Sequence, residues 1–137
     1  VGGLVGQHAW WENVRILRYA DVVLMYAEAA NELGKTNEAL EKLEWIRARA
    51  RGANTSVLPK VTTTNQAKLR LAIQHERRIE LAMEHERFFD IVRWGIASDV
   101  LHAAGKINYK TGRDELLPIP QAQIDISNGV LHQNPGY

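Results

Sequence analysis

The spacing of apolar residues in the first 51 positions most strongly constrains the fold of this chain. Over residues 13–33 apolar side chains lie nearly all round a helical wheel, and the polar positions form one strip, Arg18, Asp21, Glu28 and Glu32. After Gly34, residues 38–51 carry apolar side chains on one face only, at i, i+4, i+7 and i+11. The short link predicts an antiparallel helical hairpin whose first helix is largely buried.

Two further helices are predicted before the pattern changes. Thr63 with Gln66 three residues later fits a capping box, which opens a third helix to about residue 84. A fourth helix is predicted over residues 86–104, with Gly105 at its end, and its aromatic residues are expected in the core, namely Phe88, Phe89 and Trp94. Beyond it, residues 107–109 suggest a short strand or turn, and two prolines hold residues 116–120 extended. The fold class is therefore all-α, with an irregular C-terminal tail that contains at most short strands.

Composition excludes several classes of function. Seventeen Lys and Arg against sixteen Asp and Glu give a net charge of +1, which is far from the basic surface that nucleic-acid binding requires. No apolar run approaches the roughly 20 residues of a membrane span. Zero cysteines exclude disulfides, thiolate metal sites and cysteine nucleophiles. We expect no nucleic-acid partner.

Two carboxylates in the third predicted helix are the most informative residues for chemistry. Glu76 and Glu80 fall in the middle of an apolar face, where each needs a cation, a metal or a proton. A functional interpretation is an acid/base pair or a metal site, but a di-iron site would need Glu-x-x-His, and neither residue has histidine at +3. The structural interpretation, which we favour, is pairing with arginines, for which Arg15, Arg18, Arg47, Arg49, Arg87 and Arg93 are available. We predict no catalytic residue, no metal site and no cofactor.

Trp10 and Trp11 are adjacent and precede the first predicted helix. Exposed indole rings form flat platforms on which sugar rings stack, so the pair is a candidate ligand-binding site. The competing interpretation is that the two rings pack on the core where the helix begins. Both interpretations remain open from the sequence. Glycine-rich residues before them predict a flexible leading segment over residues 1–12.

Five blocks in order along the chain resemble the C-terminal part of the SusD/RagB family. They are residues 18–29 (RYADVVLMYAEA), 46–50 (IRARA), 75–84 (HERRIELAME), 87–95 (RFFDIVRWG) and 117–137, which includes LPIP and the closing QNPGY. The resemblance covers residues 13–137, which it identifies as a SusD-like C-terminal helical domain and a fragment of a longer chain. The family usually has glycine after the third-helix glutamate, where the chain turns, and this chain has His85 there. Either that turn is less sharp, or the His85 backbone adopts a left-handed conformation.

The resemblance implies tetratricopeptide-like helix pairs in a nutrient-binding lipoprotein of Bacteroidetes-type outer membranes. Such a protein binds glycans or peptides without cleaving them and docks on a SusC-like TonB-dependent transporter, and a lipid anchor upstream of this fragment is its only membrane association. The family's ligand-contacting aromatic residues lie largely upstream. The charged residues of the matched blocks are therefore expected to form structural ion pairs: Arg18, Asp21, Glu76, Arg78, Glu80, Arg87, Asp90 and Arg93.

Two other functions are consistent with the residues. One is a free-standing tetratricopeptide-like module that binds a partner protein, although about three repeats are usually needed for such an array and only one hairpin is clear. The more remote one is an enzyme that uses Glu76 and Glu80 as acid and base.

Overall fold

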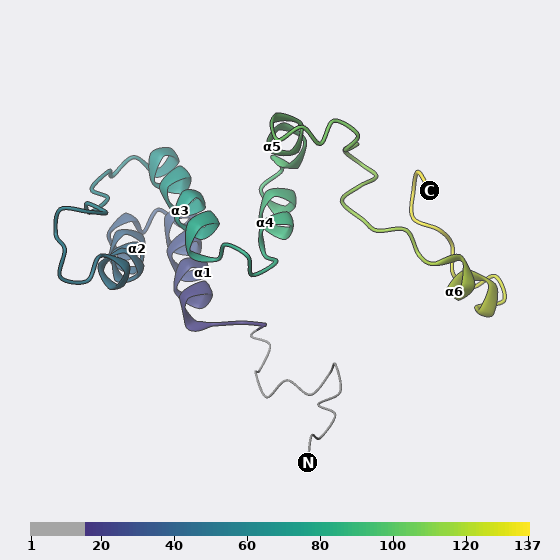
Figure 1. Cartoon of the computed structure of the whole chain (residues 1–137), viewed down its shortest axis with the longest axis horizontal. Helices are drawn as coiled ribbons and strands as arrows, with labels where there is room; N and C mark the ends of the chain where they lie inside the picture. The colour runs from purple at the N-terminus through teal and green to yellow at the C-terminus, as the bar shows by residue number, and fades with distance from the viewer. Residues whose placement is uncertain (1–15) are drawn as a thin grey trace, which may run out of the picture. The chain divides into compact units, whose positions relative to one another are not determined.

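The computed structural model describes residues 16–137, which contain six α-helices and no β-strand (Figure 1). The helices are α1 (Tyr19–Glu32), α2 (Thr36–Arg51), α3 (Gln66–Glu80), α4 (Arg87–Arg93), α5 (Ala97–Ala103) and α6 (Gln121–Ile126). The all-α prediction is confirmed. The chain divides into two compact units, one ending at Glu84 and one over His85–Tyr137.

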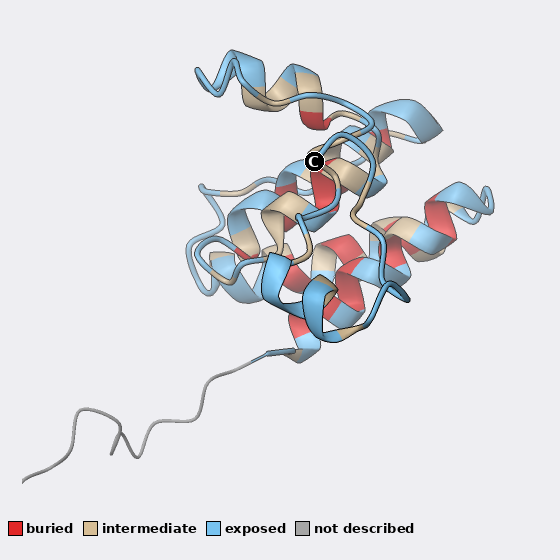
Figure 2. Ribbon diagram, turned by 90° about the vertical axis from the view of Figure 1, so that its right-hand side faces the viewer, coloured by how far each residue is buried: buried red, intermediate tan, exposed pale blue. Residues whose placement is uncertain are grey.

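Helices α1, α2 and α3 form the core of the first unit. The fully buried side chains Leu24, Leu43, Leu69 and Ile73 come from all three helices and belong to one apolar cluster. Figure 2 shows the buried residues gathered on one side of each helix, with exposed residues opposite. Gly34, at φ +73°, makes the turn between α1 and α2, as the hairpin prediction requires.

Helix α1 differs from its prediction at its start and in its burial. It begins at Tyr19 rather than near residue 13, because Arg18 is extended with φ −134° and ψ 158°. It is not buried all round: several large apolar side chains on it are exposed, namely Tyr19, Val22, Met25 and Tyr26.

Helix α3 begins and ends with residues other than those predicted. Asn65, not Thr63, caps it by accepting a hydrogen bond from the Lys68 backbone N–H at 3.0 Å. Thr63 instead accepts from the Asn65 backbone N–H at 3.3 Å. The helix ends at Glu80. His85 has φ +67°, so it adopts the left-handed conformation that was one of the two expectations for this position.

In the second unit the predicted fourth helix is two short helices. Gly95 adopts φ +70° between α4 and α5, a conformation that costs little only without a Cβ atom, and it ends α4. Ile91 is buried, but Phe89 is 66% exposed within the described chain, so its predicted place in the core was wrong. That prediction rested on aromatic side chains that point in several directions around one helix, and Phe89 is at an exposed position of α4.

Amide side chains hold the extended tail. Gln133 pairs with both backbone groups of Ile119, accepting at 2.8 Å and donating at 2.9 Å, and Asn134 donates to the Leu117 carbonyl at 2.6 Å. The Tyr137 hydroxyl donates to Asp114 Oδ1 at 3.2 Å and lies 3.0 Å from the Leu116 carbonyl oxygen. The terminal aromatic residue is thus attached to residues 114–116 of the tail.

The Asp114 carboxylate gives a pH prediction for this tail. Arg113 donates to it from two nitrogens, and together with the Lys110 backbone N–H lowers the pKa of Asp114 to about 2. Because the folded pKa is below the ordinary value, the stabilisation is present above about pH 4 and is lost as the pH falls towards 2. An NMR titration should find the pKa of Asp114 near 2 and raised in Arg113→Gln. An ordinary pKa in the unaltered chain would contradict the arrangement.

Candidate functional site

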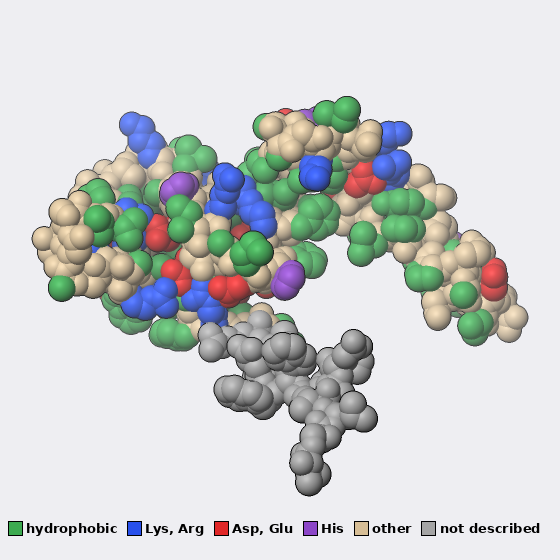
Figure 3. Space-filling view, in the orientation of Figure 1, with side chains coloured by type: hydrophobic (Ala, Val, Ile, Leu, Met, Phe, Trp, Pro, Cys, Tyr) green, Lys and Arg blue, Asp and Glu red, His purple; other side chains and the backbone are tan. Residues whose placement is uncertain are grey.

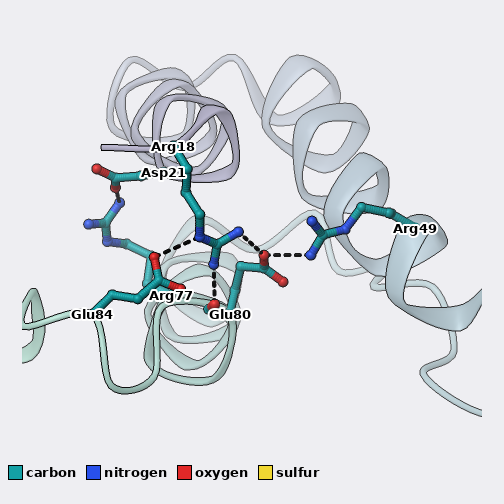
Figure 4. Close-up of polar contacts among 6 residues, drawn as sticks. All are labelled: Arg18, Asp21, Arg49, Arg77, Glu80 and Glu84. Atoms are coloured by element: carbon teal, nitrogen blue, oxygen red, sulfur yellow. Dashed lines mark hydrogen bonds and ion pairs between the residues drawn. The ribbon is translucent and has the colours of Figure 1, made fainter. Parts of the chain in front are cut away.

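Glu80, at the end of α3, is the centre of an ion-pair network that joins three helices (Figure 4). Arg18 donates from Nη1 to Glu80 Oε1 at 2.6 Å, from Nε to Glu84 Oε2 at 2.6 Å, and from Nη2 to the Glu80 backbone carbonyl. Arg49 of α2 donates to the same Glu80 Oε1 at 2.5 Å. One carboxylate therefore connects the residue before α1 to both α2 and α3.

The Arg18 guanidinium fits this place because all three of its nitrogens are used at once. The hydrogen bond to Glu84 raises the pKa of Arg18 above its ordinary value; partial burial opposes the shift, and Glu80 adds to it. A lysine could supply the charge but not three donors in a fixed plane. The arrangement of acceptors around position 18 therefore fits arginine and not lysine.

Glu76, one turn before Glu80, has its own arginine. Arg47 of α2 donates from Nη1 to Glu76 Oε2, and from Nε and Nη2 to the Pro59 carbonyl at 3.2 and 3.0 Å. Both side chains are largely buried. The pair therefore fastens α2 to α3 and also ties the loop between these helices to the same guanidinium.

An almost completely buried ion pair joins α1 to α3. Arg77 donates from Nη1 to Asp21 Oδ1 at 2.7 Å, and the two side chains are 3% and 9% exposed. Arg77 was not among the cations considered from the sequence. Its position offered a signal, because Leu69, Ile73 and Arg77 follow at intervals of four on the buried face of α3.

Two pockets lie beside this network, both within the first unit. The larger, of about 560 Å³, lies between α2, α3 and the loop that joins them. The smaller, of about 280 Å³, lies at the start of α1 beside α2. Both are lined by Arg18 and Arg49. Figure 3 shows basic and acidic side chains next to one another over the α1–α3 region.

Comparison with known proteins identifies the family. The model of the SusD family matches residues 7–137. The chain belongs to the SusD family. SusD-like proteins P2 and P38 of Formosa agariphila are 36% and 37% identical to it over 127 and 129 residues, which cover 88% and 91% of this chain. The chain spans about a quarter of the length of these relatives.

Solved structures of SusD relatives share the fold of this SusD-family chain. A SusD homolog from Bacteroides thetaiotaomicron aligns with a TM-score of 0.78 at 33% identity, covering 88% of this chain and 26% of the homolog. A SusD-like protein from Bacteroides fragilis aligns with a TM-score of 0.69 at 32% identity, covering 91% of this chain and 26% of that protein. The helical arrangement described above is therefore that of the family.

The remaining charged residues singled out from the sequence lie outside the Glu80 network. In the second unit, Arg93 donates from Nη2 to the buried Asp90 at 2.9 Å, and the Arg87 guanidinium lies 5.8 Å from the centroid of the Trp94 ring. Arg78 is exposed and forms no ion pair with any residue of 16–137. Trp10 and Trp11 fall outside the described residues.

No group of three or more Asp, Glu or His side chains in residues 16–137 is placed to hold a metal ion. None of the helices within that range is long and apolar enough to cross a membrane. Glu76 and Glu80 each accept from at least one guanidinium, which holds the carboxylates in place.

Proposed function

We propose that this chain is the C-terminal helical portion, over residues 13–137, of a longer non-enzymatic protein that binds glycans or related nutrients. In this proposal the protein lies at the bacterial outer-membrane surface, held by a lipid anchor upstream of this chain. It delivers its ligand to a SusC-like TonB-dependent transporter. The observation that carries the proposal is the SusD family match over residues 7–137.

The geometry of the carboxylates supports a structural role over catalysis. A general acid or base must exchange its proton with a substrate, and it must reach that substrate directly or through one water molecule. Glu80 accepts two guanidiniums on one oxygen atom, and Glu76 is paired with a largely buried Arg47. Such pairing favours carboxylates that fasten helices together, as a scaffold for a binding site needs.

Calorimetric titration of the full-length protein with oligosaccharides tests this function. We expect saturable binding of at least one oligosaccharide, with the ligand recovered uncut, and co-purification with the transporter from outer membranes. Recovery of cleaved ligand, or binding of peptides with no response to any saccharide, would contradict the proposal. Trp10→Ala and Trp11→Ala test whether that pair is a ligand platform, since a platform predicts weaker binding with unchanged thermal stability.

A further inference from the structure

Arg49 lies where the two pockets beside the ion-pair network meet. The larger pocket and the smaller one share only Arg18 and Arg49 among their lining residues. In Figure 4 the Arg49 side chain reaches from α2 towards Glu80, on the side of that carboxylate away from Glu84. A ligand that spans both pockets would therefore pass this guanidinium.

Arg49 differs from the other arginines of the network in its unused donors. Its side chain is 61% exposed, and its one polar contact with residues 16–137 is the Nη2 bond to Glu80. A guanidinium carries five N–H donors, so most of those of Arg49 are open to an acceptor outside the chain. Arg18 and Arg47, in contrast, each use all three nitrogens on protein oxygen atoms.

The larger pocket adds an exposed imidazole and an apolar wall. His75 lines it, is exposed, and has no polar partner within residues 16–137. The two acidic residues of the pocket, Glu76 and Glu80, are already paired with arginines. Three arginines, Arg18, Arg47 and Arg49, line the pocket against these two carboxylates, and this excess of positive charge favours a ligand carboxylate.

The smaller pocket adds aromatic side chains. Tyr19 of α1 and Trp45 of α2 line it, and both are exposed. Trp45 is 48% exposed, and the Lys42 ammonium lies 3.9 Å from the centroid of its ring. Aromatic faces beside hydrogen-bond donors are suited to the apolar face and the hydroxyls of a sugar ring.

We propose that this chain contains a subsite for an acidic saccharide, in which Arg49 binds the carboxylate of a uronic acid. The neighbouring sugar ring lies against Trp45 and Tyr19, and the larger pocket receives the acidic ring beside His75. The inference rests on the proposed function and deepens it by naming the class of glycan and a place for it on this part of the chain.

Trigalacturonate and its methyl ester, titrated against the full-length protein, test the subsite. The ester keeps the rings and removes the charges, so we expect the free acid to bind at least about tenfold more tightly. Arg49→Gln should abolish that preference, while Arg18 still holds Glu80 and keeps the fold. Arg70→Gln is the matched control, because Arg70 is also a part-exposed arginine paired with one glutamate, lies on α3 and lines neither pocket.

The aromatic side of the subsite is tested separately. Trp45→Ala should weaken binding of the trisaccharide several-fold, whereas Phe89→Ala, an exposed aromatic residue outside both pockets, should not. Equal binding of acid and ester, an Arg49→Gln variant that keeps the preference, or acetate binding as tightly as the trisaccharide would overturn the inference. Binding of neutral glycans that is insensitive to Arg49 would overturn it and leave the proposed function intact, whereas a protein that binds no saccharide would contradict both.

Discussion

Replacing Asp21 with alanine is expected to lower the free energy of unfolding by about 3–5 kcal/mol. The Arg77 guanidinium is almost completely buried and cannot lose its charge, so removal of the carboxylate at 2.7 Å leaves a buried cation without this anion. The partner helices, α1 and α3, would lose the ion pair that joins their buried faces. Urea denaturation followed by circular dichroism measures the change.

An exposed ion pair between the same two helices is the control. Glu32 of α1 accepts from Arg70 of α3 at 2.6 Å from two nitrogens, which lowers the pKa of Glu32. Both side chains are more than a third exposed, so Glu32→Ala should cost no more than about 1 kcal/mol. Equal losses in the Asp21 and Glu32 variants would show that burial of the Asp21 pair contributes nothing.

Replacing Glu76 with alanine is expected to cost a similar amount, about 3–5 kcal/mol. Arg47 would lose its carboxylate in a place where its side chain is 12% exposed. Since the same guanidinium holds the Pro59 carbonyl, amide hydrogen exchange around that residue should also accelerate.

Glu38→Ala is the comparison for this variant, because Glu38 is an exposed carboxylate that contacts Tyr26 and Lys35 on the surface. It should leave both stability and exchange near Pro59 almost unchanged. A Glu76→Ala variant of full stability that had lost an activity would instead support the acid/base interpretation of this residue.

The helical hairpin could be predicted because local signals agree there. The apolar stripe of α2 and a glycine at the turn both point to the same structure, and the structure has it. The single helix predicted after residue 86 failed because a helical wheel treats Gly95 as one more position, whereas its left-handed conformation ends α4 and starts a new direction. Phe89 lies within α4, before this break, and is exposed.

The glutamates of the site could be predicted from the sequence, whereas their arginine partners could not be assigned. Glu76 and Glu80 stand out because carboxylates on an apolar face of one helix are visible from spacing alone. Which arginine reaches which carboxylate depends on how α1 and α2 are placed against α3, and spacing within one helix does not contain that information. Arg77 was missed because it stands in a run of charged residues, His75 to Arg78, and such a run is usually exposed to solvent, whereas Arg77 is buried.

Arginine–glutamate pairs fasten these helices together, and a double-mutant cycle on Arg18 and Glu80 tests this role. The unfolding free energies of Arg18→Met, Glu80→Gln and the double variant are compared with that of the unaltered chain. We expect a favourable coupling energy of about 1–3 kcal/mol, because Arg18 donates a charge-assisted hydrogen bond to the largely buried Glu80 side chain. Additive losses, with a coupling energy near zero, would contradict it.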